Sequence, residues 1–191
     1  MKTTPAIKDD MTHAVAAPTR DRARCPVAGA AIGVLDQCDR LLRELPDAAY
    51  AAPSRILPGG TIGKHTRHAI DHFAALLSGH EQRRTVDYDH RERGVPMETV
   101  RAEAVAALSS LRQRLDTLAA PEMNAPIRVR VMLTADGADA ELLSTLGREL
   151  AFAAHHAVHH HAMIKAIAAE HGHAAPADFG TAPSTLAHHS S

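Results

Sequence analysis

Residues 151–163 read AFAAHHAVHHHAM, a run of small apolar residues that is interrupted by five histidines. Steps of three and four residues through the surrounding segment pick out one stripe, and an α-helix turns such a stripe toward a protein core. The stripe comprises Leu142, Leu146, Glu149, Ala153, His156, His160, Met163 and Ile167. The sequence therefore predicts a long last helix, from about Ala138 to His171, with His156 and His160 on its inner face.

These two histidines are suited to hold a metal ion. They lie four residues apart, about one helical turn, which is the spacing at which helical metal sites take two ligands. His155 and His159 have the same spacing, but their stripe is mostly polar, so we expect them at the solvent edge. A helical phase that differs by one residue would make His155 and His159 the ligands instead.

A second histidine cluster precedes this one. A helix is predicted over residues 62–78, with Thr61 as its N-cap, and it carries His65, His68 and His72 beside apolar residues on one face. One of the three can supply a third ligand, and three nitrogens with open coordination positions are typical of a reactive site. Pairing of the histidines through water or carboxylates is the alternative, because each unpaired buried imidazole costs about 1–3 kcal/mol.

The rest of the chain adds two helices and few strands. Helical spacing of apolar residues predicts helices over 27–45 and 96–118, and residues 50–60 form a loop rich in proline and glycine. Residues 127–133 alternate with a period of two, which indicates an extended connector or a small edge hairpin. The expected fold is all-α, an antiparallel four-helix bundle with a short extended segment before the last helix.

Three segments are expected along the chain. Residues 1–26 are predicted to be a flexible N-terminal arm, residues 27–186 the bundle domain, and residues 187–191 a frayed tail with solvated His188 and His189.

Composition excludes several classes of partner. The formal net charge of −1 suggests no nucleic-acid partner, and no segment approaches the roughly 20 apolar residues of a membrane span. The two cysteines, Cys25 and Cys38, make no disulfide framework, so we expect a cytoplasmic protein. Cys38 lies near apolar residues of the first helix, which favours inert burial over a role as nucleophile.

The chain resembles the DinB-like superfamily of four-helix bundles from about Ala30 to Leu186. The resemblance is carried by IGKHTRHAIDH at residues 62–72 and HAVHH at residues 156–160. It implies that His68, His156 and His160 hold one divalent ion. Zn is the first expectation, with Ni or Fe as alternatives, because imidazole suits all three metals.

The resemblance leaves the reaction open. Its characterised members include thiol S-transferases and thiol-dependent isomerases, which implies a small-molecule substrate, such as a low-molecular-weight thiol. The expected activity is therefore thiol S-transfer or hydrolysis by an activated thiol or water. A metal-stabilised or stress-responsive binding protein without catalysis is the alternative. A homodimer is a further expectation.

Other residues are candidates for supporting chemistry. His65 and His72 are expected to line the cavity, where one of them accepts a proton. Glu149 is a candidate to orient a ligand imidazole or to act as a base, and an ion pair with an arginine from another helix is the alternative. Asp71 is a candidate to orient an imidazole, although a surface position is the simpler interpretation. Arg91 or Arg93 is a candidate to bind an anionic substrate.

Overall fold

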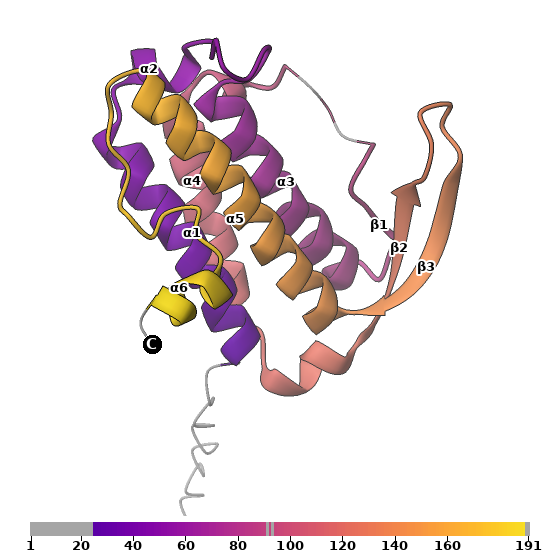
Figure 1. The fold of residues 1–191 in the computed structure, drawn as a ribbon. Helices are drawn as coiled ribbons and strands as arrows, with labels where there is room; N and C mark the ends of the chain where they lie inside the picture. Colours follow the sequence, from indigo (N-terminus) through magenta and orange to yellow (C-terminus); the bar gives the residue numbers. More distant parts are fainter. Residues whose placement is uncertain (1–24, 91, 93, 190–191) are drawn as a thin grey trace, which may run out of the picture.

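The computed structural model describes residues 25–90, 92 and 94–189, so the predicted N-terminal arm lies outside this range apart from Cys25 and Pro26. Four long helices form the body of the molecule (Figure 1): α1 (Pro26–Glu44), α3 (Ile62–Glu81), α4 (Arg101–Asp116) and α5 (Leu146–Glu170). α1 packs against α4 and α5, and α3 packs against the same two helices. The described chain is therefore mostly helical, and these four helices supply most of its apolar core.

The two helices that carry the histidines begin at capping threonines. Thr61 Oγ1 accepts a hydrogen bond from Lys64 N at 3.0 Å, and Thr145 Oγ1 accepts one from Arg148 N at 3.3 Å. Each cap satisfies a backbone N–H group that has no partner inside the helix. On α3, apolar side chains spaced by seven, four and three residues share one face and are buried: Ile62, Ala69, Phe73 and Leu76.

A three-stranded sheet stands beside the helices, in the order β1 (Val86–Asp87), β2 (Pro126–Met132) and β3 (Asp139–Thr145). β1 is parallel to β2, and β2 is antiparallel to β3, with Val129 opposite Leu142. The expectation of an all-α fold is therefore wrong at this point, and of the two interpretations of residues 127–133 the hairpin is the one observed.

The hairpin also corrects the start of the last helix. Residues 139–145 form β3, so Leu142 lies on a strand with 52% of its surface exposed, and α5 begins at Leu146. The extended segment β2 needs hydrogen-bond partners for its backbone, and residues 139–145 supply them. The helix starts only where Thr145 provides a cap.

Short elements complete the chain. They are α2 (Asp47–Ala51), the 3-10 helices η1 (Pro96–Glu98) and η2 (Ala120–Asn124), and α6 (Pro183–His189). The predicted helix over 96–118 is thus divided into η1 and α4. The predicted frayed tail is helical up to His189, and residues 190–191 lie outside the described range.

Two contacts hold peripheral segments against α5. Glu170 accepts hydrogen bonds from Ser54 Oγ at 2.7 Å and from Arg55 N at 2.8 Å, which fixes the loop between α2 and α3. Phe179 is buried and stacks on His161, with ring centroids 4.5 Å apart.

Within the described residues, the apolar stretches of the helices are too short or too polar to cross a membrane.

A glycine permits the close approach of η1 to α3. A Cβ atom at Gly63 would lie 2.1 Å from the carbonyl oxygen of Glu98 and 2.8 Å from the ring of Tyr50. The Tyr50 hydroxyl donates a hydrogen bond to the carbonyl oxygen of Met97 at 2.7 Å. Tyr50 and Gly63 therefore both contact the backbone of η1.

We therefore predict that Gly63→Ala lowers the free energy of unfolding by about 1–3 kcal/mol, because the added methyl group overlaps backbone atoms. Gly33 is the matched control, since it lies within α1 and a Cβ atom there meets nothing within 4 Å. Gly33→Ala should raise stability by about 0.5–1 kcal/mol through helix propensity. Denaturant titration measures both variants, and a stabilising Gly63→Ala would contradict the close approach.

Candidate metal centre

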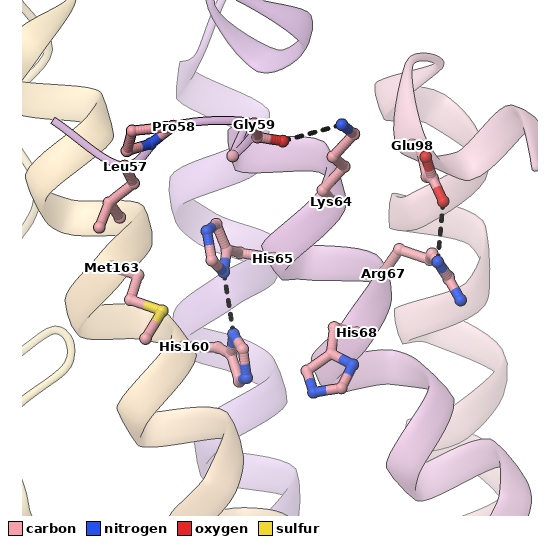
Figure 2. Close-up of a pocket in the computed structure, with 11 residues that line it drawn as sticks. Leu57, Pro58, Gly59, Lys64, His65, Arg67, His68, Glu98, His160 and Met163 are labelled. Carbon is pink, nitrogen blue, oxygen red and sulfur yellow. Dashed lines mark hydrogen bonds and ion pairs between the residues drawn. The ribbon is translucent and has the colours of Figure 1, made fainter. Parts of the chain in front are cut away.

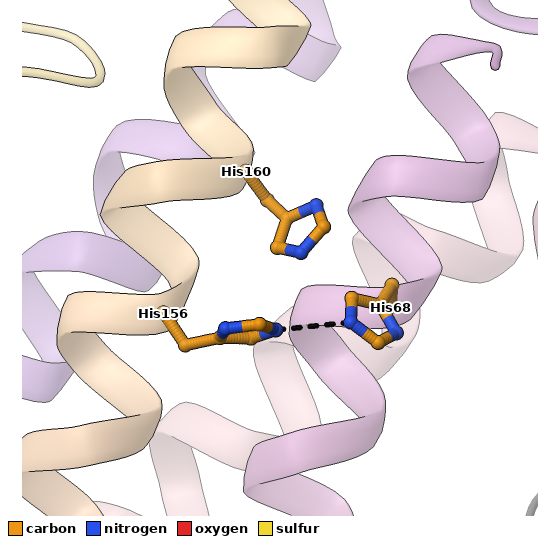
Figure 3. Close-up of side chains that lie close together, drawn as sticks. All are labelled: His68, His156 and His160. Atoms are coloured by element: carbon orange, nitrogen blue, oxygen red, sulfur yellow. Dashed lines mark hydrogen bonds between the residues drawn. The ribbon is translucent and has the colours of Figure 1, made fainter. Parts of the chain in front are cut away.

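Three histidines from two facing helices converge on one point (Figure 3). His68 comes from α3, and His156 and His160 come from adjacent turns of α5. Each offers one ring nitrogen, and the three nitrogens lie within 4.8 Å of one another. The Nε2 atoms of His68 and His156 are 2.9 Å apart. The structure thus brings together the three residues to which the family resemblance points.

The donor set fits a divalent ion. Nitrogens bound to a tetrahedral Zn²⁺ lie about 3.3 Å apart, so the pair at 2.9 Å would need to separate only slightly. Burial, together with the neighbouring histidines, lowers the pKa of His160 to about 3. A neutral imidazole keeps the lone pair that binds a metal, so the local environment favours the ligating form.

His65 contacts the ring of His160 and fixes its orientation. Their Nδ1 atoms are 3.0 Å apart, so one ring donates a hydrogen bond to the other. This contact occupies Nδ1 of His160 and leaves its Nε2 for an ion. Metal-binding histidines commonly donate their second ring N–H to a carboxylate, a carbonyl or water, and His65 takes the place of such a partner here. His65 is half-buried, and burial lowers its pKa.

His72 is buried next to the three histidines and packs against Tyr88. Its Nδ1 donates to the carbonyl oxygen of His68 at 2.9 Å, and its ring stacks on Tyr88 with centroids 4.9 Å apart. The Tyr88 hydroxyl donates to Glu149 at 2.9 Å. Burial and the nearby Glu149 carboxylate raise the pKa of Tyr88. Tyr88 lies in a polar stretch of sequence, which is why the sequence pattern did not single it out.

Glu149 is buried and accepts hydrogen bonds from three side chains. In addition to Tyr88, it accepts hydrogen bonds from Ser144 Oγ at 2.7 Å and Arg148 Nη1 at 3.0 Å. An arginine partner is therefore present, but it lies on the same helix as Glu149 and not on another helix as predicted. Three donors on a buried carboxylate indicate an anchor between the sheet and α5.

The remaining candidates lie apart from the three convergent nitrogens. His155 and His159 are exposed, as their polar stripe predicted. Asp71 pairs with Arg67 at 2.8 Å. Burial raises the pKa of Cys38 to about 12, which keeps its thiol protonated. Arg91 and Arg93 lie outside the described residues.

A cavity of about 680 Å³ opens beside the histidines (Figure 2). His65, His68 and His160 form part of its wall. The loop between α2 and α3 contributes another part, and Met163 faces it from α5. The full lining comprises Leu57, Pro58, Gly59, Gly60, Lys64, His65, Arg67, His68, Glu98, His160 and Met163. A ligand in this cavity would therefore contact two of the three convergent histidines.

Comparison with known proteins gives one family and one relative. The model of the DinB superfamily matches residues 31–164, which is more than half of the chain. A protein named FK506-binding protein 5, from Rhizopus delemar, is 35% identical over 104 residues. This match covers 54% of the chain and 27% of the relative, so the chain spans about a quarter of the length of that protein. No solved structure matches the chain.

The geometry predicts which histidines are needed to bind Zn²⁺. His68→Ala, His156→Ala and His160→Ala should each weaken binding by more than about 100-fold, because each removes a nitrogen from the convergent set. His65→Ala removes only the partner of His160 and should cost roughly 10- to 100-fold. His155→Ala, on the exposed face of the same helix, is the control and should change nothing.

Calorimetric titration of untagged, chelator-treated protein with Zn²⁺ measures these affinities. Tight stoichiometric binding by His68→Ala would refute the assignment on α3. Loss of binding in His155→Ala would refute the assignment on α5.

Proposed function

The chain belongs to the DinB superfamily, and from this premise we propose that it is a metal-dependent thiol S-transferase in which His68, His156 and His160 hold the ion. We also propose that its four long helices form an antiparallel four-helix bundle, with the ion between α3 and α5. The observation that carries the proposal is the convergence of three imidazole nitrogens beside a cavity. Three protein ligands leave coordination positions open for a substrate, which is the arrangement of catalytic sites.

A divalent ion at this position would lower the pKa of a bound thiol or water toward neutrality. Imidazole donors suit Zn, Ni or Fe, and Zn is the first choice because it is borderline soft and accepts both nitrogen and sulfur. The resemblance to thiol S-transferases favours a thiol over water as the nucleophile.

The proposed step is a simple substitution. The thiolate sulfur attacks an electrophilic carbon, a C–S bond forms, and the leaving group departs with its bonding electrons. The proton of the thiol passes to solvent. Leu57, Pro58 and Met163 would hold the apolar part of the substrate, because they line the cavity beside His160. His65 would hold the ring of His160 in place through the contact between their Nδ1 atoms.

Only one of the three candidate proton acceptors lines the cavity. His65 does, whereas His72 is buried against Tyr88 and Glu149 is hydrogen-bonded to three donors. We therefore assign His72 and Glu149 to the support of the site.

A structural role for the ion is the second candidate function. Its support is that the ion would join α3 to α5 through His160, which is buried, and the half-buried His68 and His156, so that it would act as a cross-link between the helices. A free metal concentration of 1,000 times the dissociation constant would then stabilise the fold by about 4 kcal/mol.

We predict that the Zn²⁺-loaded protein accelerates the reaction of N-acetylcysteine with 1-chloro-2,4-dinitrobenzene by at least about tenfold over the uncatalysed rate. The metal-free protein and His156→Ala should give only the background rate, and His155→Ala should behave as the wild type. Absorbance of the dinitrophenyl thioether follows the reaction.

Two other results would reject S-transfer. Turnover of p-nitrophenyl acetate without any thiol would indicate hydrolysis. A metal-dependent rise in melting temperature, with neither activity, would indicate the structural role.

A further inference from the structure

We infer that Lys64 selects the ligand of the cavity, so that the site takes small molecules with a metal-binding group at one end and a carboxylate at the other. The inference rests on the proposed function in one respect, since it needs a divalent ion at His68, His156 and His160. It adds the chemical class of the ligand and the residue that recognises it.

The charged residues of the cavity wall differ in how far their charges are already neutralised. Arg67 is buried, and its guanidinium group pairs with Asp71 and Glu98, each at 2.8 Å. Its Nη2 also donates to the carbonyl oxygen of Glu92 at 2.7 Å. Arg67 and Glu98 therefore neutralise each other, and neither has a free charge with which to bind a ligand.

Lys64 is the exception among these charges. It is an exposed residue of the cavity wall, and its Nζ donates to the carbonyl oxygen of Gly59 at 2.8 Å (Figure 2). A carbonyl is a neutral partner, and an ammonium group has three N–H donors. In the described part of the chain, no carboxylate forms an ion pair with Lys64. Its charge is thus available to an anion that enters the cavity.

Lys64 lies on the same face of α3 as His68. The two residues are four positions apart, so their Cα atoms are separated by about 6 Å along the helix axis. A molecule with a short carbon chain between its metal-binding atom and its carboxylate would extend from the ion toward Lys64. Leu57, Pro58 and Met163 line the same cavity and suit the aliphatic part.

The ligand set of the ion strengthens the preference for anions. Three neutral imidazoles bring no negative charge, so both positive charges of a divalent ion would remain beside the ammonium of Lys64. Attraction between unlike charges is stronger in a partly enclosed site than in bulk water. A ligand with an anionic group at each end is therefore favoured over one with a single anionic group.

The test compares matched ligands by calorimetric titration of the Zn²⁺-loaded protein. The first pair is 3-mercaptopropionate and the neutral-ended 3-mercaptopropan-1-ol. The second pair avoids sulfur and consists of glutarate and its half-amide, glutaramate. In the wild type, the ligand with the extra carboxylate should bind about three- to fivefold more tightly in each pair, which is the range for a solvent-exposed ion pair.

Lys64→Met should bring both ratios close to one while leaving Zn²⁺ binding unchanged, and Lys64→Arg should keep the preference. Lys165→Met is the matched control. Lys165 lies on α5 outside the cavity, and its Nζ donates to the carbonyl oxygen of Ala177 at the same distance of 2.8 Å. This variant loses the same charge and the same kind of hydrogen bond, and should retain the wild-type ratios.

The outcomes separate this inference from the proposed function. Ratios near one in the wild type, or an unchanged preference in Lys64→Met, would overturn the role of Lys64 whatever the reaction is. If neither thiol binds while glutarate is still preferred, thiol transfer is refuted and the role of Lys64 stands. A protein that takes up no divalent ion would refute both.

Discussion

The packing of α3 against α5 places several imidazole rings where water has little access. His160 and His72 are less than a tenth exposed, and His68 and His156 lie between them. Burial disfavours the charged form of an imidazole, as the lowered pKa of His160 indicates, and a buried ring must share its nitrogens with its neighbours. The contacts between the histidines follow from this requirement, and so does the suitability of the cluster for a cation that accepts several lone pairs.

Two polar anchors hold the surroundings of the cluster in place. On one side, Glu149 ties Tyr88 to α5, and Tyr88 in turn supports the ring of His72. On the other side, Arg67 ties α3 to Glu98 of η1. Both anchors are buried groups with matched partners, and removal of one partner would leave an unsatisfied charge. The convergence of the nitrogens therefore depends on residues that would never touch an ion.

The sequence predicted the parts of this arrangement that follow from helical periodicity. The phase of α5 places His156 and His160 inward and His155 and His159 outward, because a stripe of apolar residues fixes the orientation of a helix. The same rule failed at Leu142, since a strand that needs a pairing partner overrides a helical pattern of a few residues. The cavity, the stack of Tyr88 on His72 and the ion pairs of Arg67 depend on tertiary packing between distant segments. Periodicity carries no information about such contacts.

The separation of the convergent histidines along the chain has a consequence for the order of folding. His68 and His156 are 88 positions apart, and the cavity also needs the loop that Glu170 holds in place. During synthesis from the N-terminus, α3 would leave the ribosome long before its partner helix exists, with its histidines still exposed to solvent. Closing so long a loop costs conformational entropy that only the finished interface can offset. Capture of an ion would accordingly be among the last events of assembly, and an incomplete chain would have no competent site with which to withdraw metal from the cell.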